Sequence, residues 1–237
     1  MGSSQEKSPR VLLLDLPQTD YESSIRIQRA ILQQRLRSSG EDVVILLEHP
    51  PTITLGVRAD ESDLLLSPDE LTARGIDVCR SDRGGQATYH GPGQLVCYPL
   101  LDLRRHGLSV RDYVTRLEET ILCIVSSFGV TGFRVKGKPG VWTPTGRKIA
   151  SIGVRVQRRV TSHGFSLNVN VPLEPASFMV SCGDPNTRLA NLRELAQRDV
   201  EMAAVRAAAA SCLARVLGVR LHPVSLNTIL GLDWEAV

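Results

Sequence analysis

The sequence predicts a mixed α/β (α+β) fold, and three observations lead to that expectation. Apolar runs typical of buried strands occur in both halves of the chain. Segments with apolar residues at helical spacing lie between these runs. Several short strands follow one another after Gly129, so strands and helices do not alternate in a strict strand–helix–strand rhythm.

Four segments carry the spacing and the end signals of helices. In the first, Ile25, Ile31 and Leu36 lie near helical spacing. Ser67 and Ser109 are typical N-cap residues, and glycines close all four segments. Helices are expected over Asp20–Gly40, Ser67–Gly75, Ser109–Gly129 and the Ala-rich Arg198–Gly218.

Apolar runs bounded by turn-forming residues indicate the strands. The run after Val11 is almost wholly apolar, and His49 with the two prolines after it ends the second run. The triplet Pro-Thr-Gly, residues 144–146, predicts the turn of a hairpin. Strands are expected over Val11–Leu16, Asp42–Glu48, Ile76–Arg80, Gln94–Leu103, both arms of Gly140–Gln157, and Thr161–Val171, with a loop-rich segment over Pro172–Leu189.

Composition excludes several classes of protein. The chain has 237 residues, of which 42% are hydrophobic and only 4% aromatic, so aliphatic side chains must fill a sizeable core. A net charge of +3 is too small for a dedicated nucleic-acid-binding protein. No apolar run approaches the roughly 18 residues that span a bilayer, so we expect no membrane association. The polar N-terminus has no apolar signal-peptide region and is expected to be disordered.

The five cysteines are widely spaced and form no Cys-x-x-Cys pair. A disulfide framework or a structural zinc site is therefore not expected, and a reducing cytoplasm is the simplest setting. Four of the thiols lie in apolar strands or helices and are expected to pack in the core. These four are Cys79, Cys97, Cys123 and Cys212.

Cys182 differs from the other cysteines because it lies in the turn-forming run Ser-Cys-Gly-Asp-Pro-Asn. A thiol on a turn can accept a reactant, although this feature alone favours a loop cysteine without a functional role. Lys148 follows the predicted hairpin turn, and the strand after it carries small residues that let another segment approach. A lysine beside Cys182 would lower the pKa of the thiol and favour the nucleophilic thiolate. The alternative for Lys148 is an ordinary surface lysine.

The stretch Arg83–Gln94 is rich in glycine and polar residues and raises the question of a phosphate site. A P-loop requires a lysine that this stretch lacks, and a dinucleotide loop opens a helix, whereas a strand follows here. His90 and His163 adjoin glycines near strand ends. A pocket role and a structural hydrogen bond remain equally open for them. No histidine has metal-ligand spacing, so no metal is expected.

Four motifs, taken in order, resemble the octanoyltransferases, also called lipoyl(octanoyl)transferases or the lipoate-protein ligase B family. They are RGGQATYHGPGQLVCYPLLDL, GVWTPTGRKIASIGVRV, HGFSLNVN and SCG, and EHPPTITLGVRAD matches a further element of the family. The resemblance extends from about Val11 to Leu192. The chain carries Ser181 where family members often have proline.

The resemblance implies a mixed-sheet fold shared with lipoate- and biotin-protein ligases. It implies transfer of an octanoyl group from acyl carrier protein to a lysine of a lipoyl domain, through a thioester on Cys182 with Lys148 as its partner. No cofactor is expected, neither ATP nor a metal, since thioester exchange is nearly balanced in energy. The substrate pocket maps onto Arg83, Gly84, Gly85, Gln86, Ala87, Thr88, Tyr89, His90, Ser151, Ile152, Gly153, His163, Gly164, Phe165 and Ser166.

The partners implied are acyl carrier protein as the donor, and as acceptors the lipoyl domains of 2-oxoacid dehydrogenases and the glycine cleavage H protein. Two groups of arginines are candidates to bind an acidic carrier protein: Arg155 with Arg158 and Arg159, or Arg104 with Arg105. A solvated basic face without a partner fits these arginines as well. Residues 1–9 are expected to form a disordered tail. Residues 10–237 are expected to form a single catalytic domain with a helical C-terminal segment.

Two rival functions remain open. An ATP-using lipoate or biotin ligase on the same fold would adenylate a free acid and need no cysteine. A non-catalytic adaptor that binds a carrier protein would have no use for an activated thiol. Replacement of Cys182 separates the transferase from the ligase, and thiol reactivity near neutral pH separates it from the adaptor.

Overall fold

The computed structural model describes residues 8–37 and 40–231, apart from the side chain of Cys182. Most of the expected N-terminal tail, residues 1–7, lies outside the described residues. Among the described residues, no helix has the length and apolar character needed to cross a membrane.

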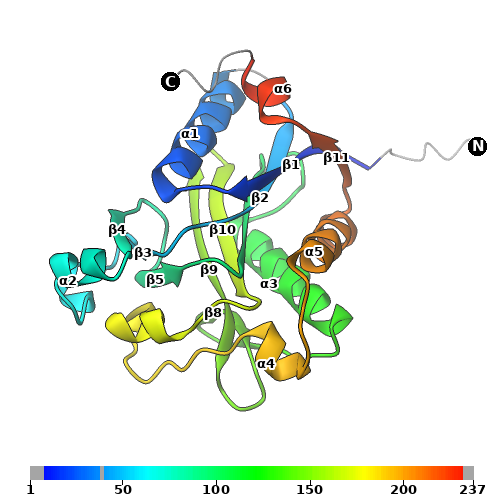
Figure 1. Cartoon of the computed structure of the whole chain (residues 1–237). Coiled ribbons are helices and arrows are strands. Elements are labelled where there is room, and N and C mark those ends of the chain that lie inside the picture. Colours follow the sequence, from blue (N-terminus) through cyan, green and yellow to red (C-terminus); the bar gives the residue numbers. More distant parts are fainter. Residues whose placement is uncertain (1–7, 38–39, 232–237) are drawn as a thin grey trace, which may run out of the picture.

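Two β-sheets organise the chain (Figure 1). The large sheet has eight strands in the order β11-β1-β2-β6-β10-β9-β8-β7, and the small sheet has the order β4-β3-β5. In the large sheet β1 pairs in parallel with β2 and β11, and the other pairs are antiparallel. The strands are β1 (Arg10–Gln18), β2 (Asp42–Glu48), β3 (Thr52–Leu55), β4 (Asp77–Arg80), β5 (Ala87–His90), β6 (Gln94–Leu100), β7 (Phe133–Val135), β8 (Lys138–Trp142), β9 (Lys148–Gln157), β10 (Val160–Asn168) and β11 (Arg220–Val224). The predicted mixed α/β fold is confirmed.

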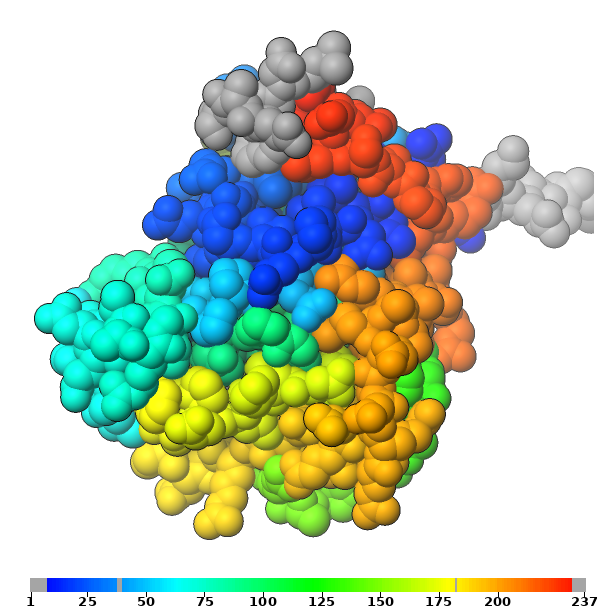
Figure 2. Space-filling model, in the orientation of Figure 1, coloured from blue at the N-terminus to red at the C-terminus, as the bar shows by residue number. Residues whose placement is uncertain are grey.

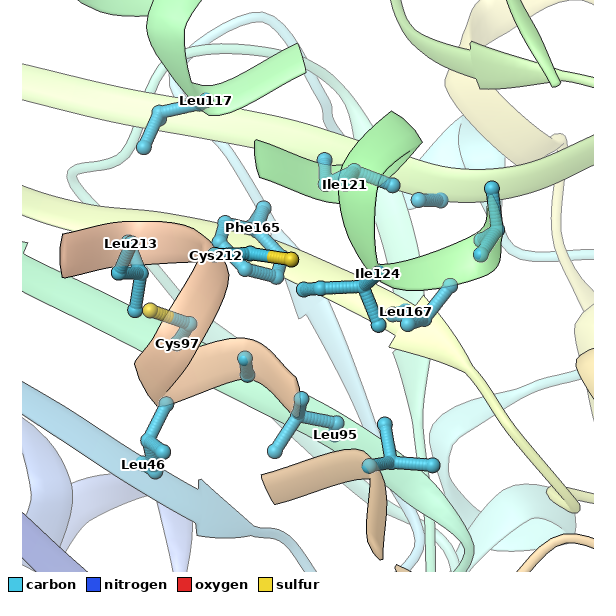
Figure 3. Close-up of a cluster of buried hydrophobic side chains, with 14 of the residues drawn as sticks. Leu46, Leu95, Cys97, Leu117, Ile121, Ile124, Phe165, Leu167, Cys212 and Leu213 are labelled. Carbon is cyan, nitrogen blue, oxygen red and sulfur yellow. The ribbon is translucent and has the colours of Figure 1, made fainter. Parts of the chain in front are cut away.

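Helices cover both faces of the large sheet. On one face, α3 (Val110–Ser127) and α5 (Met202–Leu217) pack together over an aliphatic core (Figures 1 and 3). On the other face, α1 (Tyr21–Arg37) packs over a second core, beside α6 (Leu226–Leu230). Successive side chains of β2 alternate between the two cores, as the pleat of a strand requires. The short helices α2 (Pro68–Ala73) and α4 (Leu192–Ala196) lie at the periphery.

The caps at Ser109 and Gly218 confirm two of the predicted helix ends. The Ser109 side chain accepts a hydrogen bond from the Asp112 amide, and the Asp112 carboxylate accepts one from the Ser109 amide. Gly218 ends α5 in the left-handed conformation with φ 67°. That helix begins at Met202 rather than Arg198, because Glu201 stands at its N-cap in extended conformation.

The expectation that the cysteines form no disulfide is wrong. Cys123 of α3 and Cys212 of α5 form a disulfide. Their separation of 89 residues gives no local signal, and the contact exists only because α3 packs on α5. Cys97 is buried in the core as predicted, whereas Cys79 is only half-buried (Figure 3 shows Cys97 and Cys212).

Candidate active site

A cavity of about 320 Å³ opens between the small sheet and the start of β9. It is closed on one side by the loop Arg83–Thr88 and on the other by the turn between β7 and β8. Its lining includes Arg58, Arg83, Gln86, Thr88, Lys138, Trp142, Lys148, Ser151, Ile152, Asp184 and Thr187. Lys148, Arg83 and the neighbourhood of Cys182 therefore meet at one place, although they are far apart in the sequence.

Lys148 is fixed at the first position of β9. Its amide donates to the carbonyl of Arg188 at 2.8 Å, and the amide of Ala190 donates to the Lys148 carbonyl at 2.9 Å. The Lys148 side chain is buried in spite of its charge, and its Nζ lies 5.2 Å from the centroid of the Trp142 ring. These backbone bonds tie the segment that follows Cys182 to the strand that carries Lys148.

The main chain at Cys182 forms the short 3-10 helix η3 (Ser181–Gly183). The amide of Val180 donates to the Asp63 carbonyl at 2.7 Å, which anchors the turn beside the small-sheet region. Figure 2 shows the yellow segment near residue 175 lying against the cyan segment of residues 50–75. Asp184, two residues after Cys182, lines the same cavity as Lys148 and forms a 3.4 Å ion pair with Lys138.

The glycine-rich loop owes its shape to the buried Arg83 guanidinium. This group donates to the carbonyls of Thr54 and Gln86, both at 2.7 Å. Gly84 donates its amide to the Val154 carbonyl at 3.0 Å, and a Cβ on Gly153 would lie 2.8 Å from the Gly84 carbonyl oxygen. The predicted close approach to the small-residue strand is thus confirmed, and the approaching segment is this loop.

Two smaller cavities adjoin the main one, and Thr88 and Ser151 line all three. The inner cavity, of about 30 Å³, extends along the paired strands β9 and β10, where Gly153 faces Gly164 and Ser151 faces Ser166. Of the predicted pocket residues, all except Gly84 line at least one of the three cavities.

Several lining residues were not predicted. Trp142 and Lys138 come from β8, and Arg58 from the loop after β3. Val96 and Tyr98 of β6 line the inner cavity. Alternation along β6 gives the only sequence signal, since Val96 and Tyr98 are two residues apart and share a face of the sheet.

A buried cluster of rings lies behind the inner cavity. The His49 Nε2 lies 2.8 Å from the Tyr98 hydroxyl, and the His90 ring is stacked near Tyr21 with centroids 6.2 Å apart. His90 Nδ1 lies 2.7 Å from the side-chain oxygen of Gln94. Burial lowers the pKa of His49 to about 4 and that of His90 well below its usual range, so both rings are neutral at pH 7.

These two histidines make the folded chain sensitive to mild acid. Below about pH 6.5 these histidines bind protons in the unfolded chain but stay neutral in the folded chain. The free energy of unfolding therefore falls as the pH drops toward 4. For His49, with a folded pKa of about 4, the free energy of unfolding should fall by about 2 kcal/mol between pH 7.5 and pH 5. Urea denaturation at both pH values measures this loss, and His49→Gln should reduce it. An equal free energy of unfolding at pH 7.5 and pH 5 would contradict the lowered pKa of His49.

The predicted carrier-binding arginines lie near the far end of β9 from Lys148 and are engaged within the chain. Arg155 pairs with Asp82, whose pKa is lowered to about 2, chiefly by its hydrogen bond with His163. Arg104 pairs with Asp102 at 2.9 Å. Arg155 and Arg104 are thus each paired with a carboxylate of the same chain.

Comparison with known proteins agrees with this fold. The family model of the lipoyl protein ligase A/B catalytic domain matches residues 20–214. A bipartite lipoate protein ligase from Thermoplasma acidophilum has a similar structure, with a TM-score of 0.76 at 17% identity over 95% of this chain and 91% of that one. A lipoate-protein ligase A bound with ATP gives a TM-score of 0.75 at 17% identity, covering 94% of this chain and 92% of that one. The fold expected from the lipoate-protein ligases is confirmed.

The fold and the matched domain thus define a member of the lipoyl protein ligase A/B class. The octanoyltransferase of Desulfotalea psychrophila is 41% identical over 92% of this chain and 98% of its own length. That of Chloroflexus aggregans is 46% identical over 69% of this chain and 75% of its own length. The chain belongs to the octanoyltransferase family and is an acyltransferase.

Proposed function

We propose that the chain moves an octanoyl group from octanoyl-acyl carrier protein to a specific lysine of lipoyl domains, through a thioester on Cys182. The acceptors are the lipoyl domains of 2-oxoacid dehydrogenases and of the glycine cleavage H protein. The observation that carries the proposal is the cavity shared by Lys148 and Asp184, the second residue after Cys182. We also propose that residues 10–237 act as one catalytic unit.

In the first half-reaction the Cys182 thiolate attacks the thioester carbonyl of the carrier. A new carbon–sulfur bond forms, and the bond to the carrier sulfur breaks. The ammonium of Lys148 favours the thiolate beforehand and gives a proton to the departing carrier sulfur. One thioester replaces another, so the step is nearly balanced in energy and consumes no ATP.

In the second half-reaction the amine of the acceptor lysine attacks the enzyme thioester. A carbon–nitrogen bond forms, the bond to Cys182 breaks, and the neutral Lys148 amine takes the proton lost by the acceptor. The amide is more stable than the thioester, and this difference drives the reaction. Backbone amides near Ser151–Gly153 supply the stabilisation of the oxyanion in both halves.

The acyl chain lies in the main cavity and reaches the inner cavity past Thr88 and Ser151. On this proposal the stretch Arg83–Gln94 is a wall of the acyl pocket and not a phosphate cradle. The buried Arg83 guanidinium donates hydrogen bonds to carbonyl groups of the loop and of β3. These bonds shape the loop as a pocket wall, and they engage the guanidinium that a phosphate would need.

Gly140 positions Lys148, and its replacement tests that role. It has φ 117°, and a Cβ there would overlap the Ala150 carbonyl oxygen and lie 2.8 Å from Lys148 Cε. Gly140→Ala should therefore shift the start of β9 together with the Lys148 ammonium and lower octanoyl transfer by about 10- to 100-fold. Gly146→Ala is the matched control, since Gly146 also has positive φ, 75°, but nothing lies within 4 Å of its Cβ position. Equal rates for the two variants would contradict a positioning role.

The dependence on ATP tests the proposed function against the ligase alternative. A purified lipoyl domain is incubated with the chain and octanoyl-acyl carrier protein without ATP, and separately with free octanoate and ATP. The proposal predicts modification of the acceptor lysine in the first mixture alone. Modification confined to the second mixture would identify a ligase, and no modification in either would favour the carrier-binding adaptor.

A further inference from the structure

A second cavity, of about 200 Å³, lies between α1 and the paired strands β9 and β10. Ile25, Leu32 and Leu36 of α1 give it an apolar wall, and Gln28 gives it a buried amide. The rest of its lining is polar or charged and comes from Arg29, Gln33, Asp82, Arg155, Gln157, Ser162 and His163. Of the described residues, His163 alone lines both this cavity and the inner cavity of the active site. The His163 side chain therefore stands between two spaces that would otherwise join.

His163 is held in a strained position in the middle of β10. Its φ is 56°, a left-handed conformation that a bulky residue adopts within a strand only when its surroundings impose it. Its Nε2 lies 2.7 Å from Asp82 Oδ1, and its amide donates to the Gln28 side-chain oxygen at 2.8 Å. Its ring meets the Tyr98 ring edge-on with centroids 6.1 Å apart. Two contacts of the ring and one hydrogen bond of the backbone amide thus hold His163 in place.

We propose that His163 closes the inner end of the acyl pocket and sets the longest acyl chain that the enzyme accepts. This inference rests on the proposed function. The inner cavity holds about 30 Å³, against about 320 Å³ for the main cavity, so methylenes beyond those of the normal substrate find little room before they meet the imidazole. The apolar wall of the second cavity offers suitable room once the imidazole is removed.

The variant His163→Gly tests the wall directly. Glycine adopts positive φ without strain, so the change removes the side chain and leaves the backbone conformation accessible. The ratio of kcat/KM with dodecanoyl- to that with octanoyl-acyl carrier protein should rise at least about tenfold, since each newly buried methylene contributes about fourfold. Gln197→Gly is the control, because Gln197 also has positive φ, 52°, and lines neither cavity.

A second change shows where the longer chain goes. Leu32→Phe added to His163→Gly narrows the second cavity and should return the chain-length preference toward octanoyl. If His163→Gly does not fold, His163→Asn replaces it, because asparagine tolerates the left-handed region and is smaller than histidine. His163→Asn should shift the ratio in the same direction by a smaller factor.

The outcomes separate this inference from the proposed function. If a folded His163 variant forms the octanoyl thioester but keeps the wild-type chain-length profile, the wall role is overturned and the proposed function stands. If the wild type forms no octanoyl thioester, the proposed function itself fails. A raised dodecanoyl ratio that Leu32→Phe does not lower would also overturn the proposal that the second cavity receives the chain.

Discussion

Cys182→Ala should lower octanoyl transfer by at least about a thousandfold, because the variant has no nucleophile to form the acyl-enzyme and the remaining groups provide only binding and orientation. The variant should remain folded, since the main chain at Cys182 forms a short 3-10 turn and the substitution removes a single sulfur atom. Steady-state transfer to a lipoyl domain measures the loss, and circular dichroism checks the fold.

Cys79→Ala is the matched control for this substitution. Cys79 is a half-buried free thiol on β4, and it lines none of the three active-site cavities among the described residues. Its replacement should leave transfer within about twofold of wild type, as for most changes remote from a reacting group. A Cys182→Ala enzyme that kept more than a tenth of its activity would contradict the thioester mechanism.

Lys148→Met should lower transfer by about 100- to 10,000-fold, the usual range for loss of a general acid–base group. Methionine keeps an apolar stem over the Trp142 ring and removes only the charge and the protons. Both half-reactions depend on those protons. Single-turnover measurements should therefore show slower formation and slower discharge of the acyl-enzyme.

Lys138 offers the control for Lys148. Its Nζ also lies over the Trp142 ring, 5.6 Å from the centroid, but the side chain is exposed and pairs with Asp184. Because exposed ion pairs contribute little, Lys138→Met should change transfer by less than about fivefold. Equal losses in the two variants would mean that a general positive charge at the cavity, and not proton transfer by Lys148, supports the reaction.

Capping residues, turn-forming residues and small residues in a strand predicted those parts of the structure that neighbouring residues in the sequence determine. The caps at Ser67 and Ser109 marked helix starts, and the Pro-Thr-Gly turn placed Lys148 at the start of a strand. The small residues of that strand indicated a close approach, which the loop at Gly84 makes.

Features that depend on long-range packing gave no such signal. The four-residue strand β5 lies inside the glycine-rich stretch and owes its pairing to β3. Likewise β11 gains its place only by parallel pairing with β1, more than 200 residues earlier. The Cys123–Cys212 disulfide exists only because α3 packs on α5. The cavity behind His163 exists only because α1 packs on the sheet. The sequence alone predicts neither packing.

The most direct test of the central claim is the intact mass of the chain after incubation with octanoyl-acyl carrier protein in the absence of ATP. The account predicts a gain of one octanoyl group on the wild type and none on Cys182→Ala. Hydroxylamine should remove the adduct, and a lipoyl domain should accept it. If the wild type stays unmodified while a lipoyl domain is octanoylated only with ATP and free octanoate, the thioester mechanism is contradicted.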